Sequence, residues 1–263
     1  MTDALATTSL QAALRERIDG GGKCLVPYLT GGLGDWTTYL SAVAAAGADG
    51  IEVGIPFSDP VMDGPVIQEA SDLALRAGAT PAGILDELRH ADVGVPLAVM
   101  TYVNLVYRFG YQRFASTLAA SGVAGAILPD VPLEESADWC AAADDAGVET
   151  VMLAAPTAPD ERLERIVARS RGFVYAVGLM GVTGERDALA GSASVIARRL
   201  KAVTDLPVLV GVGISNPAQA VEVCQVADGV VVGSAVVRRV LETRSPEAVA
   251  DLVGEFRTAL DAG

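Results

Sequence analysis

Eight short apolar runs recur along the chain, and segments with helical periodicity separate them. Apolar runs of this length predict buried strands, and their regular alternation with helices predicts parallel pairing through crossover connections. No other feature of the sequence limits the choice of fold as strongly. The predicted strands are residues 24–30, 50–55, 96–101, 125–129, 149–153, 173–177, 207–210 and 229–233.

The predicted helices fill the gaps between these strands. Gly47, Gly122 and Gly147 each follow alanine or serine residues, where glycine favours the end of a helix. One helix is expected between the second strand and residue 81. The others are residues 9–19, 37–46, 81–90, 111–121, 134–146, 193–203, 217–226 and 246–260.

The α/β pattern predicts a single (β/α)8 TIM barrel. Eight parallel strands leave no free edge when they close on themselves, which makes the barrel the simplest arrangement. The helix before the first strand and the second helix after the second strand are additions to that plan. The chain of 263 residues is near the typical size of such a barrel, so residues 1–263 are expected to form one catalytic domain. An open doubly wound sheet is the alternative.

The composition narrows the class of partner. The formal charge of −14 argues against nucleic acid and against an anionic membrane surface, because both attract basic patches. Apolar residues make up 51% of the chain but fall in runs too short to span a bilayer. The N-terminal segment lacks the basic start and apolar core of a secretion signal, which favours the cytoplasm. Because the net charge is negative, an anionic substrate would need a local group of hydrogen-bond donors or positive charges to bind it.

Barrel geometry predicts where the chemistry lies, because reactive groups of such enzymes gather at the carboxyl ends of the strands. Lys23, Asp49 and Asp205 precede strands and are therefore expected at the opposite end. The residues expected at the catalytic end are Glu52, Asp59, Asp63, Tyr102, Asn104, Asp130 and Tyr175.

Lysine and histidine exclude some kinds of chemistry. Lys23 precedes the first strand and Lys201 lies within a helix, so neither is placed to form a Schiff base. His90 ends a predicted helix, which argues against a histidine-based triad or metal site. The cysteines lack metal-ligand spacing and are expected to be reduced and packed: Cys24, Cys140 and Cys224. The remaining candidate is acid and base catalysis by carboxylates.

Glu52 lies inside an otherwise apolar strand, where a charge is costly unless it is paired, solvated or neutralised by a shifted pKa. An ion pair or a backbone cap would explain it, but the glycine- and proline-rich loop that follows favours catalysis. Asp63 is either a second catalytic carboxylate or a residue of a turn or helix start. Asp59 is more typical of a turn. Tyr102 and Tyr175 are equally consistent with packing aromatics whose hydroxyls are solvated.

Glycine-bearing loops follow the last three predicted strands, at residues 181–184 (GVTG), 211–215 (GVGIS) and 233–234 (GS). Each loop alone is typical of an ordinary turn. Together, in the last loops of a barrel, they favour a phosphate cradle made of backbone amides and a helix N-terminus. Such amides can hold an anion that the net charge of the chain repels.

Seven motifs, in this order, resemble those of tryptophan synthase alpha chains: LVPYLTGG, EVGIPFSDPVMDGPVIQ, TYVNLVYRFG, PDVPLEE, GVTG, GVGIS and GSAVV. The resemblance covers nearly the whole chain, and residues 52–68 are its most specific part. It implies a lyase of tryptophan biosynthesis that cleaves indole-3-glycerol phosphate to indole and glyceraldehyde 3-phosphate by a retro-aldol reaction. It also implies that this chain needs no cofactor or metal of its own.

The resemblance implies a role for each residue of the site. Glu52 would be the general acid and base, and Asp63 would accept a hydrogen bond from the indole N–H. Thr183 would contact Asp63 when the site closes. The residues implied beside the substrate are Tyr28, Tyr102 and Tyr175, and those implied around its phosphate are Gly184, Gly213, Gly233 and Ser234.

The resemblance also implies a partner, a beta subunit that carries pyridoxal phosphate and takes up the indole in an αββα complex. Residues 56–65 and the segment around Asp130 are expected to meet it. Leu179 and Met180 stand where the family often has a polar residue, a departure that concerns regulation more than chemistry. Three alternatives stay open: a stand-alone lyase that releases free indole, a catalytically weak barrel that acts as an allosteric partner, and a phosphate-sugar isomerase on the same fold.

Overall fold

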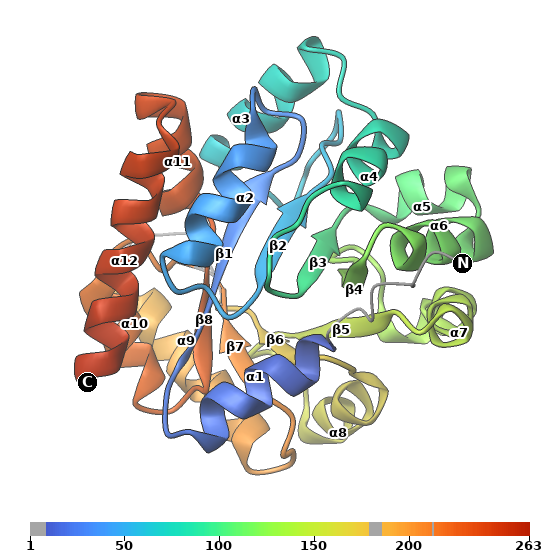
Figure 1. Ribbon diagram of the computed structural model, residues 1–263. Helices are drawn as coiled ribbons and strands as arrows, with labels where there is room; N and C mark the ends of the chain where they lie inside the picture. Colours follow the sequence, from blue (N-terminus) through green and yellow to red (C-terminus); the bar gives the residue numbers. More distant parts are fainter. Residues whose placement is uncertain (1–8, 179–185, 212) are drawn as a thin grey trace.

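The computed structural model describes residues 9–178, 186–211 and 213–263. Within them, eight parallel strands form one closed barrel in chain order. Helices lie around the strands as an outer layer (Figure 1). The last strand pairs with the first through four residue pairs, from Cys24 with Gly229 to Pro27 with Val232. This pairing confirms the predicted barrel and rules out the open doubly wound sheet.

All eight predicted strands are confirmed. The fourth strand begins and ends two residues earlier than expected, because pairing starts directly after Gly122, which adopts a φ of 72°. The strands are β1 (Cys24–Thr30), β2 (Ile51–Gly54), β3 (Leu97–Met100), β4 (Val123–Ile127), β5 (Glu149–Ala154), β6 (Val174–Ala176), β7 (Val208–Val210) and β8 (Gly229–Val232).

The helices begin and end at residues that suit those positions. Proline stands in the first turn of four of them, and Thr80, Asn216 and Ser245 accept backbone N–H groups as N-caps. Gly47 and Gly147, like Gly122, have positive φ values at helix ends, as predicted. The helices are α1 (Leu10–Asp19), α2 (Trp36–Ala45), α3 (Pro65–Arg76), α4 (Pro81–Arg89), α5 (Val103–Phe109), α6 (Tyr111–Ala120), the short η1 (Leu133–Glu135), α7 (Ala137–Ala146), α8 (Asp160–Arg169), α9 (Arg186–Lys201), α10 (Pro217–Cys224), α11 (Ser234–Thr243) and α12 (Pro246–Ala262).

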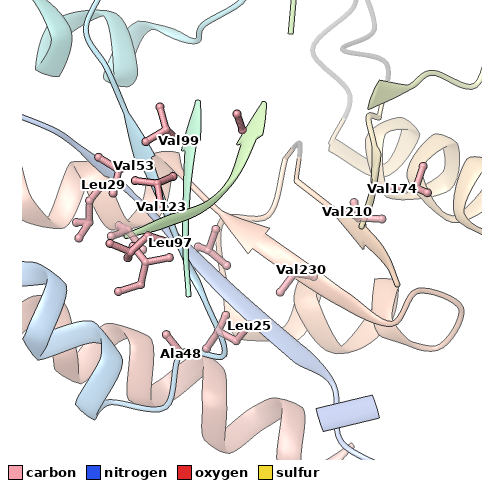
Figure 2. Packing of buried hydrophobic residues seen from close by; sticks show 14 of the residues in the cluster. Leu25, Leu29, Ala48, Val53, Leu97, Val99, Val123, Val174, Val210 and Val230 are labelled. Atoms are coloured by element: carbon pink, nitrogen blue, oxygen red, sulfur yellow. The ribbon is translucent and has the colours of Figure 1, made fainter. Parts of the chain in front are cut away.

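Side chains alternate between the two faces of each strand. Leu25 and Leu29 of β1 belong to the large cluster that packs the strands against the surrounding helices, and Figure 2 shows this outward set. Cys24 and Val26 of the same strand belong to the cluster that fills the barrel interior. Tyr28, the next inward residue, lies higher in the barrel, where the interior opens into a cavity.

Helix α1 closes the amino end of the barrel. Leu10 and Leu14 are fully buried and pack with the interior side chains. The Glu149 carboxylate, at the start of β5, fixes the beginning of this helix by accepting hydrogen bonds from the Leu10 amide at 2.7 Å and the Ser9 hydroxyl at 2.9 Å. The predicted N-terminal helix therefore seals the barrel at the amino ends of its strands, opposite the end where such barrels carry their active sites.

Acidic side chains at this amino end are paired. Asp49 accepts hydrogen bonds from the Leu25 amide at 2.8 Å and from Arg257 at 3.2 Å. Asp228 accepts from the Val208 amide at 2.8 Å and from the Lys201 ammonium at 2.9 Å. These contacts tie the starts of the strands to each other and to the outer helices.

The predictions for the cysteines and for the histidine are also confirmed. The three cysteines are free and buried. His90 stands at the C-terminal end of α4. Across the described part of the chain, every helix is too short or too polar to cross a lipid bilayer.

Candidate active site

A cavity of about 440 Å³ opens at the carboxyl ends of the strands. Its polar lining comes from the predicted residues Tyr28, Glu52, Asp63 and Tyr175 and from the loops after β7 and β8. The remaining walls are apolar and come from late strand positions and from the start of α3. They include Val66, Ile67, Met100, Pro129, Leu153, Val177 and Val231. A small pocket of this kind suits a ligand with an apolar body and a few polar groups.

Glu52 occupies the second position of β2, opposite Tyr28 of β1 and Ala98 of β3. Only 1% of this residue is exposed, and its Oε2 atom meets no hydrogen-bond partner among the described residues. Burial, and then the charge of Asp63, raises the pKa of the Glu52 carboxyl to about 8. A carboxyl in this state keeps a proton at neutral pH and can donate it into the cavity.

Asp63 lies in the loop between β2 and α3, directly before Gly64, the N-cap of the helix. The loop is held from both sides, because the Met62 amide donates to the Tyr102 hydroxyl at 3.0 Å and the Gln68 side chain donates to the Asp63 carbonyl at 2.8 Å. Burial raises the pKa of Asp63 to about 6, and a hydrogen bond with Tyr102 partly offsets that effect. Asp63 is therefore ionised at neutral pH, unlike Glu52.

Tyr102 supports the loop from behind. Its ring packs on Phe57 with centroids 5.2 Å apart, and its hydroxyl joins Met62 to Asp63. The resemblance implied that Tyr102 lies beside the substrate. Tyr28 and Tyr175 line the cavity, whereas Tyr102 contacts the loop that carries Asp63.

Two glycines make room for the two cavity tyrosines. A Cβ atom at Gly54 would stand 1.8 Å from the Tyr28 hydroxyl, and one at Gly211 would stand 2.0 Å from the Tyr175 hydroxyl. Both distances are far below van der Waals contact, so a residue other than glycine at either position would displace the tyrosine ring. The sequence therefore specifies glycine at these strand ends so that two phenol groups can enter the cavity.

The loops after β7 and β8 line the cavity with glycine and the start of a helix. Gly211 and Gly213 follow β7, and Gly213 adopts a φ of 85°, which favours glycine. Gly233 and Ser234 follow β8 and form the start of α11, whose N-terminal amides face the cavity side of the barrel. This arrangement can hold an anion through backbone N–H groups and the helix dipole. The other predicted residues of this region, Thr183 and Gly184, lie outside the described residues, as do Leu179 and Met180.

Sequence reasoning missed one charged residue of the cavity. Arg238 lines it from α11, one helical turn after Ser234. The available signal was the spacing of four residues, which places both side chains on the same face of a helix. Met62, which lies in the segment expected to meet the partner, is an exposed apolar residue that also lines the cavity beside Asp63.

The other predicted residues of this end have structural contacts. The Asp130 carboxylate accepts a hydrogen bond from the Val103 amide at 2.9 Å and so joins the loop after β4 to the start of α5, where Asn104 lies. Asp59 accepts from the Ser58 hydroxyl at 2.6 Å within its turn. In the part of the chain that the structure describes, no group of three histidine, cysteine or acidic residues could hold a metal ion.

Comparisons with known proteins agree on one family. The family model described as "Tryptophan synthase alpha chain" matches residues 14–261. A tryptophan synthase alpha chain of Streptomyces coelicolor is 48% identical over 262 residues, which are 98% of this chain and 94% of that protein. One of Thermobifida fusca is 46% identical, with 97% of each chain covered. A solved structure of Mycobacterium tuberculosis tryptophan synthase superimposes with a TM-score of 0.88 at 38% identity, covering 97% of this chain and 98% of the other.

Proposed function

The chain belongs to the tryptophan synthase alpha chain family, and from this we propose that the cavity binds indole-3-glycerol phosphate and cleaves it to indole and glyceraldehyde 3-phosphate. The enzyme is a lyase of tryptophan biosynthesis, and the reaction is a retro-aldol cleavage of a carbon–carbon bond. One observation carries the proposal: the unpaired, buried Glu52 shares a cavity with Asp63 and with the loops suited to an anion.

Glu52 acts first as the acid. Its raised pKa keeps it protonated at neutral pH, so it can transfer a proton to the ring carbon that bears the glycerol side chain. The bond between that carbon and the side chain then breaks, and its electrons return to the ring. The adjacent hydroxyl becomes the aldehyde and gives its proton to the Glu52 carboxylate, which restores the starting state.

Asp63 stabilises the charge that this proton transfer creates. The protonated ring carries positive charge that is shared with the indole nitrogen, and an ionised carboxylate that accepts the N–H is most favourable at that moment. Asp63 is mostly ionised at neutral pH, because its pKa of about 6 lies below 7. The two carboxyl groups of one cavity thus differ in protonation state because their burial differs.

In this proposal the indole lies near Glu52 and Asp63, and the phosphate lies at the loops after β7 and β8. The apolar walls and the rings of Tyr28 and Tyr175 hold the indole, and the amides of Gly213, Gly233 and Ser234 hold the phosphate. Thr183 and Gly184 follow β6 in the sequence. We propose that Gly184 contacts the phosphate and that Thr183 contacts Asp63 when the site closes. A loop that closes over the substrate would exclude water from the protonated intermediate.

The chain is proposed to work as the alpha subunit of a larger enzyme. The family name and the tryptophan synthase structures support a complex with a beta subunit, and we propose the αββα arrangement, with pyridoxal phosphate in the beta subunit. The exposed Val61 and Met62, together with the segment around Asp130, would form the contact that passes indole to it. We further propose that residues 1–263 are one catalytic domain, that this chain needs no cofactor, and that it works in the cytoplasm.

The test is the release of indole from indole-3-glycerol phosphate by the purified chain, alone and with a tryptophan synthase beta subunit. Slow release that rises on addition of the beta subunit is the expected result. Fast release that is independent of the partner would instead show a stand-alone lyase. Absence of turnover in both conditions, with correct folding by circular dichroism, would contradict the proposed reaction and leave a weak allosteric partner or another phosphate-sugar enzyme.

A further inference from the structure

Arg238 carries a positive charge that the fold does not use. Among the described residues that line the cavity, it is the one lysine or arginine. It is exposed, and it has no hydrogen-bond or ion-pair partner within the described part of the chain. The cations at the amino end of the barrel, such as Arg257 and Lys201, are in contrast bound to carboxylates.

The packing of α11 fixes the direction in which Arg238 points. Val236 and Val240 are buried against the barrel side of the helix, and Val237 packs on Ile67 of α3. Arg238 therefore projects along the same face as Ser234, toward the mouth of the cavity. Its neighbour Arg239 faces α12 instead and donates a hydrogen bond to the Ala248 carbonyl.

The acidic charge of the chain and of the cavity indicates that an anionic substrate would benefit from the positive charge of Arg238. The chain has a formal charge of −14, and the other ionisable groups among the described residues of the cavity are the acids Glu52 and Asp63 and two tyrosines. A phosphate group carries about −1.5 to −2 charges at neutral pH, so its approach to such a cavity is unfavourable. Backbone amides provide partial charges only, whereas a guanidinium provides a full charge and pairs well with phosphate oxygens.

We propose that Arg238 binds the phosphate of the substrate from the mouth of the cavity, outside the amides of Gly213, Gly233 and Ser234. This inference rests on the proposed function, because it assumes that the phosphate lies at the start of α11. Arg238 attracts the anion into an acidic protein and holds it during the reaction. The phosphate keeps its charge throughout the cleavage, so the contact is equally strong in the substrate and in the transition state and affects binding rather than chemistry.

The experiment compares Arg238→Gln with the matched control Arg239→Gln, which removes a neighbouring charge from the same helix. We expect Arg238→Gln to raise KM for indole-3-glycerol phosphate about tenfold and to leave kcat within about twofold. The inhibition constant of inorganic phosphate, measured as a competitive inhibitor, should rise by a similar factor. Both constants should also depend less on salt, because the exposed charge that salt screens is gone. Arg238→Lys should retain part of the affinity, and Arg239→Gln should leave both constants unchanged.

Unchanged KM and phosphate inhibition in a folded Arg238→Gln variant would overturn the inference, and so would a loss of kcat at constant KM. Ser234→Asp, measured in parallel, separates this inference from the proposed function. If Ser234→Asp weakens binding and Arg238→Gln does not, the phosphate site stands and Arg238 has no part in it. If neither variant changes the affinity for phosphate, the phosphate lies elsewhere and the site assignment of the proposed function fails.

Discussion

Asp49 and Asp228, at the amino end of the barrel, have cationic partners, whereas Glu52 at the carboxyl end has none among the described residues. Asp228 is bound by Lys201 and by the Val208 amide, and Asp49 is bound by Arg257 and the Leu25 amide. Glu52 is more deeply buried than either acid, yet one of its oxygens lacks any described partner.

The difference shows how one fold separates stability from chemistry. Burial raises the pKa of Asp49 too, but its contacts with the Leu25 amide and with Arg257 limit that rise, and removing one partner of such a pair is costly. An unpaired buried carboxyl destabilises the fold when it is ionised, and for the same reason its pKa moves toward neutrality, where acid catalysis is efficient. The barrel can accept this cost at Glu52 because the opposite end and the outer helices hold the strands in place.

The largest expected effect comes from removing the acid itself. Glu52→Gln keeps the shape of the side chain but cannot donate a proton to the ring carbon, so turnover should fall by about 10² to 10⁴-fold. Substrate affinity should change little, because the amide fills the same space. Steady-state indole release and a binding titration measure the two quantities separately. Near-normal turnover would remove Glu52 from the acid role.

The same substitution should stabilise the fold in a pH-dependent way. The pKa of Glu52 rises from 4.5 in the unfolded chain to about 8 in the folded one, so the wild-type protein loses stability as the pH rises between these values. Glutamine does not titrate, so the advantage of Glu52→Gln should be small near pH 4.5, grow toward pH 8 and then level off, with about 5 kcal/mol as its upper limit. Urea unfolding at several pH values measures it. A difference that is constant with pH would show that Glu52 has an ordinary pKa in the folded state.

The sequence was sufficient for the fold and for part of the site. The alternation of apolar runs favoured the barrel over an open doubly wound sheet, and a charge within an apolar strand singled out Glu52. Asp63 was ambiguous by itself, because an acid before a glycine and a proline also suits a helix start, which is in fact where it stands. The contact of Tyr102 with the Met62 amide joins residues 40 positions apart, so no local pattern could reveal it. Arg238 was missed because an arginine on a helix is informative only once the direction of that helix is known.

A charge placed at the anion side of the cavity should weaken substrate binding. Ser234→Asp puts a carboxylate at the start of α11, where it satisfies the helix amides but repels the phosphate. KM should rise by about 10 to 100-fold while the fold keeps its stability or gains slightly. Ser234→Ala is the control, because it removes the hydroxyl without adding a charge. Unchanged affinity of the aspartate variant would remove the phosphate from this position.

A substitution at the amino end of the barrel should lower the stability of the fold and leave catalysis unchanged. Asp228→Asn leaves the Lys201 ammonium without its carboxylate and weakens the hydrogen bond to the Val208 amide, so the free energy of unfolding should fall by about 2 kcal/mol. The value of kcat should stay the same at temperatures where the variant is folded. Chemical denaturation and the indole assay measure the two effects. A large loss of kcat in the folded variant would contradict the separation of the two ends.

The smallest effect is expected at Tyr102, which supports the loop of Asp63 and so affects both the local structure and catalysis. Tyr102→Phe keeps the packing on Phe57 but removes the hydroxyl that accepts from the Met62 amide and hydrogen-bonds with Asp63. Without it, the loop is less well fixed and burial of Asp63 is no longer offset, so the pKa of Asp63 should rise further. We expect kcat to fall about fivefold at neutral pH and less at high pH, where Asp63 is ionised in both proteins. The pH profile of kcat therefore tests the role of Tyr102 as a positioning residue. A fall of equal size at every pH would show that the hydroxyl only holds the loop, and a rise of KM alone would place Tyr102 against the substrate instead.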